Sequence, residues 1–554
     1  MKRRRILTTL STVTAIGVWV HACGSVEQGA GPASDGGAES DNPASDGNQG
    51  DTFGAPQGDS ATGGGDASFD GSIPSSGSVL QQHNTPQRDG LYVDPVFTKA
   101  YATGLTRDMS FSGRIMGNVL AQPLYVADIT TGKDAVFILT ESNNIYSLDA
   151  TTGVANSGWP VNVGTPVPQG NLNCGGGIDL YGVSGTPIID MSARTIYAES
   201  FYLNGGNPAH QVVALSIDTG MPKSGWPVQL DGTTIPGFTA IAEHDRGALA
   251  LVNGILYVPF TGLNGDCNAA NGNPYHGGIV GIDTAHPSTI KSWFTSADAG
   301  GAWGTSGVPS DGTNVFLTTG NTTGTNGTWG GGEAVLRFAS GPVFSGNAND
   351  YWAETNWKSL DDGDTDLGSS EAIVIDVPGA TPSALLFAAG KEGKAYLVSR
   401  GNMGGISNGV ASLQASSGQI KTAFAAYRTS TGSYVVLHGD GNGANCPNGR
   451  SGELIALKIS ATNPPTLSTA WCADSKGSGS PMVTTTDGHA NALVWEVGAA
   501  SSNQLFAFDG DTGATVYGGG GANEQMQNLE HWITPMEAKG RIFVGGDGKV
   551  FAFK

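Results

Sequence analysis

Positive charge is scarce in this chain of 554 residues, which has 27 Lys and Arg against 48 Asp and Glu and a formal net charge of −21. Binding to nucleic acid phosphates needs clustered Lys and Arg, so this composition argues against a nucleic acid partner. The nine His residues are scattered, without the short spacings of a metal site. The G-x-S-x-G, H-E-x-x-H and phosphate-loop motifs are missing too, so no common hydrolase or nucleotide-binding signature is present.

Long apolar runs are missing except near the N-terminus, where basic residues 2–5 precede an uncharged, fairly apolar run over residues 6–20. That run is too short to span a bilayer comfortably and is typical of an export signal. Residues 20–23, Val-His-Ala-Cys, resemble the bacterial lipobox, which implies a signal peptide over residues 1–22 and lipidation of Cys23. The alternative is an ordinary secretory signal with an unrelated cysteine. Lipid is therefore the membrane contact that we expect.

The segment that follows is rich in Gly, Ser, Ala, Asp and Pro. Residues 24–87 contain nine acidic residues and no Lys or Arg. Such a segment cannot bury enough apolar surface to offset the entropy of ordering it. We therefore expect a disordered tether over residues 23–90 and a folded domain over residues 91–554. Gly24, in place of Asp after the lipidated cysteine, favours the outer membrane of a Gram-negative cell, on its periplasmic or surface-exposed face.

Cysteine is also rare, and four residues remain beyond the N-terminal segment. An even number in an exported chain predicts two disulfides, with three pairings open. Cys446 and Cys472 flank one apparent strand pair, so we pair them locally, which leaves Cys174 with Cys267. No C-x-x-C-H haem motif and no zinc-ligand spacing is present, so all four are predicted to be structural.

Glycine, by contrast, is abundant at 86 residues, and it accompanies a phrase that recurs along the chain. Residues 145–153, 213–220 and 505–513 each read as an apolar strand followed by an Asp-containing turn that ends on Gly, and residues 550–554 begin a fourth copy. The first two copies are followed by Trp-Pro-Val. In such turns Asp caps its own backbone and Gly takes positive φ. A strand–turn unit cannot bury its apolar face alone, so its neighbours must be further copies.

A second phrase marks the strand before each hairpin and starts eight units between residues 122 and 534, on average about 59 residues apart. Four strands with long loops fit that length, and helical periodicity does not interrupt the series. Closing such sheets into a ring removes the edges that the strands would otherwise expose. The sequence therefore predicts an all-β fold, an eight-bladed β-propeller, with seven blades as the alternative.

Several phrases together resemble one known family. They are Pro168–Cys174, Gly182–Ile188, Tyr275–Gly278, Thr318–Asn321 and Gly390–Leu397. Over roughly residues 115–554 the chain resembles bacterial quinoprotein β-propellers, which share the fold of the pyrroloquinoline quinone alcohol dehydrogenases. The resemblance implies that fold, and it implies pyrroloquinoline quinone and calcium as cofactors.

The resemblance also implies roles for five residues. Trp303, in an Ala-Trp-Gly phrase, matches the tryptophan that lies flat beneath the quinone, and Lys391 matches the cation at the quinone oxygens. Asn321 matches a calcium ligand. Asp364 matches the base that takes the alcohol proton, and Asp366 matches the second aspartate, which binds metal in some members.

Some family features are missing. The metal-binding Glu is replaced by Leu180, with Asp179 one residue away, and the adjacent cysteine pair is absent. Each matched residue also has a plainer interpretation. Trp303 is expected as a packing residue, Asn321 as a turn residue and Lys391 as an exposed hairpin residue. Residues 361–366 alternate Asp as calcium loops do, but they lack the Gly and Glu that complete an EF-hand.

Two functions follow from different classes. The first is a non-catalytic, lipid-anchored propeller of the cell envelope, a monomer whose face binds an envelope protein or a glycan; the missing Glu and cysteine pair favour it. The alternative is a quinone-dependent oxidoreductase for alcohols or sugars that passes electrons to an external acceptor, favoured by Trp303, Asn321 and Lys391. The first is slightly preferred.

Overall fold

The computed structural model describes residues 77–172, 178–263 and 274–554. The chain divides into two compact units, Met1–Asp66 and Ala67–Lys554, and every described residue belongs to the second. No helix in these ranges is long and apolar enough to cross a membrane. Cys23, Cys174 and Cys267 lie outside the described residues, so the predicted lipidation and the predicted second disulfide are not placed.

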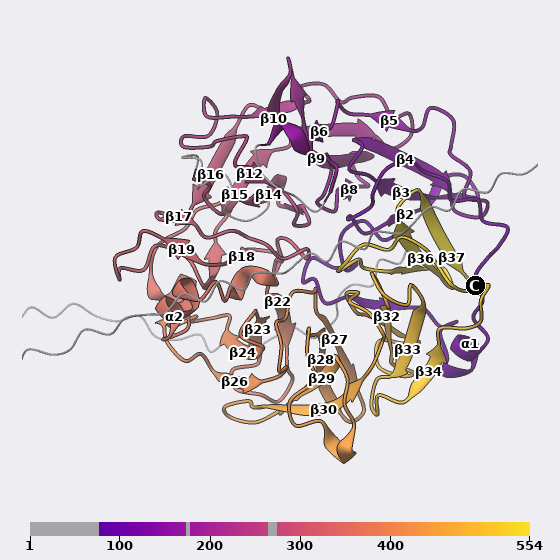
Figure 1. Ribbon diagram of the computed structural model, residues 1–554, viewed down its shortest axis with the longest axis vertical. Helices are drawn as coiled ribbons and strands as arrows, with labels where there is room; N and C mark the ends of the chain where they lie inside the picture. The colour runs from indigo at the N-terminus through magenta and orange to yellow at the C-terminus, as the bar shows by residue number, and fades with distance from the viewer. Residues whose placement is uncertain (1–76, 173–177, 264–273) are drawn as a thin grey trace, which may run out of the picture. The chain divides into compact units, whose positions relative to one another are not determined.

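Antiparallel sheets follow one another around a ring, one blade after the next (Figure 1). In the described residues there are eight blades, which confirms the predicted eight-bladed propeller over the seven-bladed alternative. The first blade contains β2 (Leu124–Thr130), β3 (Lys133–Leu139), β4 (Asn144–Asp149) and β5 (Val161–Asn162), and the second contains β8 (Ile188–Asp190), β9 (Thr195–Asn204), β10 (Asn207–Ser216) and β11 (Val228–Leu230). The third contains β12 (Glu243–His244), β13 (Ala250–Val252), β14 (Ile255–Gly262), β15 (Gly278–Asp283) and β16 (Ile290–Phe294). The fourth contains β18 (Val315–Thr319), β20 (Ala334–Phe338), β21 (Tyr351–Ala353) and β25 (Gly405–Ile406).

The other four blades continue the pattern. The fifth blade contains β22 (Ile373–Asp376), β23 (Ala384–Ala389), β24 (Lys394–Ser399) and β26 (Ala411–Gln414), and the sixth contains β27 (Ala425–Thr429), β28 (Gly432–His438), β29 (Leu454–Ile459) and β30 (Leu467–Ala473). The seventh contains β31 (Met482–Thr485), β32 (Leu493–Val497), β33 (Leu505–Asp509) and β34 (Thr515–Gly518), with β1 (Leu91–Val93) parallel to β31. The eighth contains β35 (Met536–Ala538), β36 (Arg541–Gly546) and β37 (Lys549–Phe553). Two small strand pairs and two short helices decorate the ring: β6 (Val167–Pro168) with β7 (Leu180–Tyr181), β17 (Asp298–Ala299) with β19 (Thr322–Thr323), α1 (Lys99–Thr103) and α2 (Trp357–Asp362).

The recurring Asp–Gly turns form as predicted. Asp149, at the end of β4, accepts hydrogen bonds from the backbone N–H of Thr151 and Thr152 through Oδ1, at 3.1 and 2.8 Å. Gly153 then takes a φ of +69°. Asp509 and Gly513 repeat this arrangement after β33. These turns let each third strand reverse into the outer strand of its blade.

One predicted inner strand is missing. Residues 306–311 occupy the inner place of the fourth blade, but only Ser310 forms a bridge there, to Val315. Gly307 has a φ of +69°, and Pro309 has no N–H to donate, so this stretch cannot make a regular ladder.

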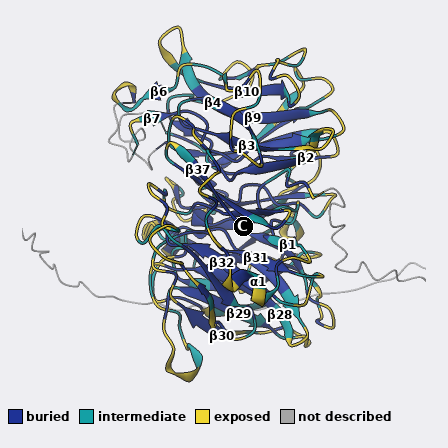
Figure 2. Cartoon of the chain, turned by 90° about the vertical axis from the view of Figure 1, so that its right-hand side faces the viewer, coloured by how far each residue is buried: buried dark blue, intermediate teal, exposed yellow. Residues whose placement is uncertain are grey.

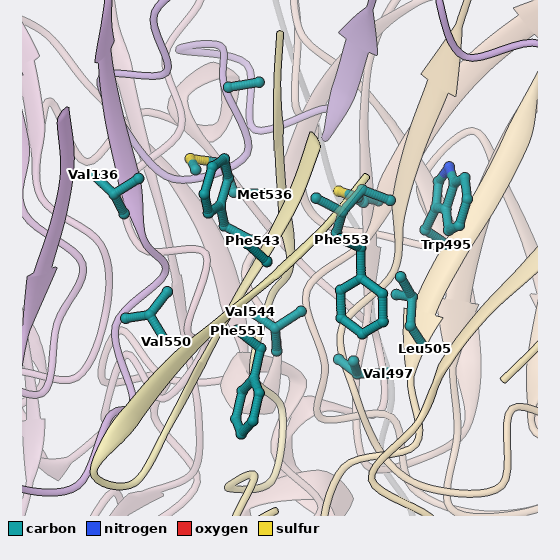
Figure 3. Close-up of a cluster of buried hydrophobic side chains, with 14 of the residues drawn as sticks. Val136, Trp495, Val497, Leu505, Met536, Phe543, Val544, Val550, Phe551 and Phe553 are labelled. Carbon is teal, nitrogen blue, oxygen red and sulfur yellow. The ribbon is translucent and has the colours of Figure 1, made fainter. Parts of the chain in front are cut away.

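The ring is closed by the two ends of the folded domain. The backbone of residues 106–113 pairs with β37: Thr106 donates to the carbonyl of Lys554 at 3.0 Å, and Val550 donates to the carbonyl of Gly113 at 2.7 Å. This early segment supplies the outer strand of the eighth blade. An apolar cluster fills the seam, with Trp495, Phe543 and Phe553 among its members (Figure 3). The inner strands are mostly buried, whereas outer strands such as β16, β26 and β34 are partly exposed, as are many turns (Figure 2).

Residues 79–94, the axial plug, cross the centre of the ring. They bond to the inner part of each described blade in turn; the partners are Val79 with Tyr125, Leu80 with Ile189, Arg88 with Leu249, Pro86 with Ser310, Gln87 with Val374, Asp89 with Ala426, Gly90 with Val483 and Asp94 with Gly540. The tether predicted to reach residue 90 therefore ends earlier. This part of the chain has little apolar surface, but the blades satisfy its polar backbone.

The predicted local disulfide is confirmed. Cys446 and Cys472 are bonded, with their Cα atoms 5.7 Å apart. Cys472 lies in β30 opposite Ile455 of β29, so the bond ties the loop before β29 to the outer strand of the sixth blade.

Candidate functional site

The five residues that the resemblance selects lie around one cavity of about 250 Å³. Trp303, Asn321, Asp364, Asp366 and Lys391 all line it. They come from two blades, in loops that precede an inner strand or follow a second strand. Such loops share one end of a propeller, which is why residues far apart in the sequence converge here.

An ion-pair network forms one wall. Asp366 is buried; its Oδ1 accepts from the backbone N–H of Asn321 at 2.7 Å and its Oδ2 pairs with Lys391. Lys391 Nζ also lies 3.1 Å from Asp364 Oδ1. Burial raises the pKa of Asp366, and Lys391 does not fully offset it. Burial lowers the pKa of Lys391, but the Asp366 carboxylate outweighs this and leaves the pKa above its ordinary value.

Trp303 lies at the cavity surface and is partly exposed. Its ring meets Tyr275 edge to face, with the ring centroids 5.8 Å apart. Its indole Nε1–H is buried without a hydrogen-bond partner. A tryptophan that served packing alone would have no cavity beside it, so this position combines a packing contact with an aromatic surface open to a ligand.

Arg246 lies between two tryptophans. Its guanidinium carbon is 5.1 Å from the ring centroid of Trp532 and 5.9 Å from that of Trp303. Among the described residues, no carboxylate lies within ion-pair distance of it. Burial lowers the pKa of Arg246 to about 10, and Glu141 acts against that shift. A partly buried cation without a counter-ion is costly, and an anionic ligand would relieve that cost.

Lys421 completes the cationic side of the cavity. Its Nζ lies 5.9 Å from the Trp532 ring centroid and pairs with Asp440 at 2.5 Å. The cavity therefore presents three cations and two indole rings in a chain with a large excess of acidic residues.

A second cavity of about 280 Å³ adjoins the first and shares Arg246 and Trp532 with it. Leu120, Ile178 and Tyr181 make its apolar wall, and its polar residues are Ser184, His244, Thr305, Glu530 and His531. We call the first cavity the cationic chamber and the second the mixed chamber.

A hydrogen-bonded chain runs through the wall of the mixed chamber. Ser184 Oγ donates to Glu141 Oε1 at 2.6 Å and lies 2.9 Å from His244 Nε2. The N–H of Gly182 donates to Glu141 Oε2 at 2.6 Å. Burial raises the pKa of Glu141 to about 7, and burial together with Arg246 lowers the pKa of His244 to about 3. His244 is thus neutral near neutral pH.

Comparison with known proteins bears on the fold. No protein-family model matches the chain, and a search of curated proteins found no significant match. Solved structures do match. A quinohemoprotein alcohol dehydrogenase of Pseudomonas putida HK5 is 12% identical with a TM-score of 0.56, and the one of Comamonas testosteroni is 14% identical with the same score; each match covers 86% of this chain and 80% of the other. A europium-containing methanol dehydrogenase is 13% identical with a TM-score of 0.54, covering 86% and 91%.

The chain has the quinoprotein alcohol dehydrogenase fold. At these identities the likeness shows the fold alone, so the chemistry of the site has to be judged from the residues present.

The residues fit pyrroloquinoline quinone, the cofactor that the resemblance implies. This quinone is a planar polycarboxylate, so it needs an aromatic surface and cations. The cationic chamber provides Trp303 and Trp532 with Arg246, Lys391 and Lys421.

The residues fit calcium poorly. Calcium takes six to eight oxygen ligands. Here both oxygens of Asp366 already accept from Asn321 and Lys391, and Asp364 has a 74% exposed side chain. In the described ranges no group of three His, Cys, Asp or Glu residues could hold a metal ion. Glu141 reaches the Gly182 backbone from another blade, and its two carboxylate oxygens accept from the N–H of Gly182 and from Ser184 Oγ.

Sequence reasoning missed Arg246, Lys421 and Trp532. A signal for them was present in the second recurring phrase, which starts each unit and is here called the inner-strand phrase. Lys421 and Trp532 directly precede its copies at residues 422–426 and 533–536, and Arg246 stands two residues before the copy at residues 248–254. Residues just before an inner strand lie at the same end of the ring.

Proposed function

We propose that this propeller binds a planar, multiply anionic ligand of the pyrroloquinoline quinone class in the cationic chamber. The observation that carries the proposal is Arg246, a partly buried guanidinium between the rings of Trp303 and Trp532 with no carboxylate partner among the described residues. A flat anionic ligand would stack on the indoles and supply the missing negative charge. Lys391 and Lys421 face the same space.

Binding without turnover is the preferred role. Asp364, predicted as the base, is mostly exposed and already bonded to Lys391, and the calcium donor set is incomplete. A ligand held by cations and indoles needs neither. In this role the ligand stabilises the propeller face that an envelope protein or a glycan would contact.

The test is a titration of the full-length protein with pyrroloquinoline quinone, followed by tryptophan fluorescence. We expect saturable quenching. Arg246→Gln should weaken binding by about 10- to 100-fold, the size of one or two charge-assisted hydrogen bonds. Arg194→Gln is the matched control, since Arg194 is paired with Asp218 on the surface of the second blade, and it should bind like the wild type. Absent saturation, or equal affinity in Arg246→Gln, would contradict the proposal.

The second candidate is a quinone-dependent oxidoreductase. It is favoured by Asp364, whose Oδ1 lies 3.1 Å from Lys391 Nζ at the cavity edge. Asp364 would accept the proton of an alcohol or sugar hydroxyl, and a bound quinone would supply the two-electron acceptor. The test is whether quinone-loaded protein reduces an artificial dye when a primary alcohol is added. If it does, and if Asp364→Asn abolishes dye reduction while it keeps the quinone affinity, the oxidoreductase role would replace the binding role.

We further propose lipid anchoring through Cys23 at the outer membrane, on the strength of the lipobox-like phrase and the acidic segment behind it. Cys23→Ser should release the protein from the membrane fraction or leave its signal uncleaved. Unchanged fractionation would contradict the anchor.

A further inference from the structure

The mixed chamber has charges of opposite sign that do not meet. Arg246 and Glu530 both line it, yet no ion pair joins them. Both act on the carboxyl group of Glu141, whose pKa Glu530 raises and Arg246 lowers, so both lie within electrostatic range of one point in the wall. The space between them is walled by Leu120, Ile178 and Tyr181.

Glu530 lacks a cationic partner. Its carboxyl group shares a hydrogen bond with that of Asp547, and Asp547 Oδ1 accepts from the backbone N–H of Val119 at 3.0 Å. No Lys, Arg or His among the described residues pairs with either acid. A nearby cation relieves the repulsion between two neighbouring carboxylates, and the described side chains do not supply one here.

Ser184 and Thr305 line the same chamber as the two charges. Ser184 is held by Glu141 and His244. Thr305 lines the chamber, and its Oγ1 is buried without a hydrogen-bond partner.

We infer that the mixed chamber binds a small zwitterion of the α-amino acid type. Its ammonium group lies at Glu530, its carboxylate at Arg246 and its apolar side chain against Leu120, Ile178 and Tyr181. A simple amine would face Arg246, and a simple carboxylate would face Glu530; a molecule with both charges satisfies both ends.

This site goes beyond the proposed quinone site, although Arg246 borders both. A guanidinium has five N–H donors in a planar fork, so it can serve a carboxylate in each chamber. Glu530 lines the mixed chamber and not the cationic one, which makes the two sites separable by mutation.

The test uses the full-length protein and three small molecules with the same branched apolar side chain. Equilibrium dialysis measures leucine, 4-methylpentanoate, which lacks the amine, and 3-methylbutylamine, which lacks the carboxylate. Leucine should bind at least about tenfold more tightly than either analogue, the value of one satisfied charge. An analogue that binds as tightly as leucine, or no leucine binding at all, would overturn the inference.

Variants locate the site. Glu530→Gln should weaken leucine binding by about tenfold while it leaves 4-methylpentanoate and the quinone titration unchanged. Glu524→Gln is the matched control; Glu524 lies in the same loop, accepts from Gly521 and does not line either chamber. Leucine affinity that is unchanged in Glu530→Gln would place the binding elsewhere and overturn the inference, whatever the quinone result.

Discussion

The axial plug and the chambers beside it each contain a buried or partly buried arginine, and the two are held differently. Arg88 of the plug is fully buried and donates to the carbonyls of Gln82 and Leu249 at 2.9 and 2.6 Å and to Gln81 Oε1 at 3.3 Å. Arg246 has two indole rings around it and no ion-pair partner among the described residues. Burial lowers the pKa of both guanidinium groups, to about 9 and about 10.

This difference in hydrogen bonding gives the two arginines different roles. A buried cation whose donors reach carbonyls of other elements helps to fix the fold. A partly buried cation whose donors face a cavity gains a partner for its charge only when an anionic ligand binds. The plug therefore should govern stability, and the chambers should govern binding.

The largest expected effect tests the plug. Arg88→Met should lower the free energy of unfolding by about 3–5 kcal/mol, because it leaves buried carbonyls without donors. Arg246→Met should change it by about 1 kcal/mol or less, or stabilise the protein, since a cation without a counter-ion is removed. Denaturant unfolding of both full-length variants makes the comparison. Equal losses would erase the distinction between the two arginines.

The disulfide offers a change in stability far from both regions. The Cys446–Cys472 bond spans 26 residues, so replacing both cysteines with Ala should cost about 3 kcal/mol on the chain-entropy estimate. Quinone affinity should not change, because the sixth blade's outer strand does not line either chamber. Thermal unfolding and the fluorescence titration measure the two effects. Reduced affinity in this variant would mean that binding follows global stability.

Stability should also fall as pH rises from about 5 to about 7, and Glu141 in the chamber wall and Asp547 beside Glu530 should both contribute. Burial raises the pKa of Glu141 to about 7, and burial with Glu530 raises that of Asp547 to about 7. A raised carboxyl pKa means that the folded state holds protons which the unfolded state has released, so this stability is lost between the unfolded pKa of about 4 and the folded pKa of about 7. In the plug, Asp89 has a pKa of about 6 and contributes less over this range.

Glu141 and Asp547 should each cost about 1 kcal/mol of stability per pH unit between roughly pH 5 and pH 7. Unfolding midpoints measured across that range check the slope, and Glu141→Gln should make it shallower. His83 and His210 act in the opposite direction between about pH 4 and pH 6.5, because burial lowers the pKa of each to about 4 and they gain a proton on unfolding. A slope that is unchanged in Glu141→Gln would remove the chamber from this account.

The smallest expected effect compares two cations of the cationic chamber. Lys391 already pairs with Asp364 and Asp366, so its charge is largely compensated. Lys391→Gln should therefore weaken quinone binding by only about threefold, less than Arg246→Gln. The fluorescence titration decides between them. A larger loss in Lys391→Gln would mean that the ligand displaces the aspartates.

The fold could be read from the sequence because its signals are local. The Asp149 and Asp509 turns and the inner-strand phrase repeat, and a propeller follows from their number. The plug could not be read in this way. Its polar residues look like those of the tether, and what orders them is hydrogen bonding to blades hundreds of residues away. Cys446 and Cys472 could be paired because they flank neighbouring strands.

Some residues of the candidate site could be predicted from the sequence and others could not. Trp303, Asn321 and Lys391 stand in phrases that the family shares, so the resemblance selected them. Arg246 and Trp532 stand just before such phrases rather than in them, and the lack of a carboxylate partner for Arg246 is revealed only by three-dimensional packing. Glu141 was missed because it reaches the Gly182 loop from a different blade.

The most direct test of the ligand site is a crystal structure of the full-length protein grown with pyrroloquinoline quinone. This account predicts the quinone stacked on Trp303 in the cationic chamber, with a carboxylate bonded to Arg246. A quinone bound outside that chamber, or Arg246 left without a contact to it, would contradict the account.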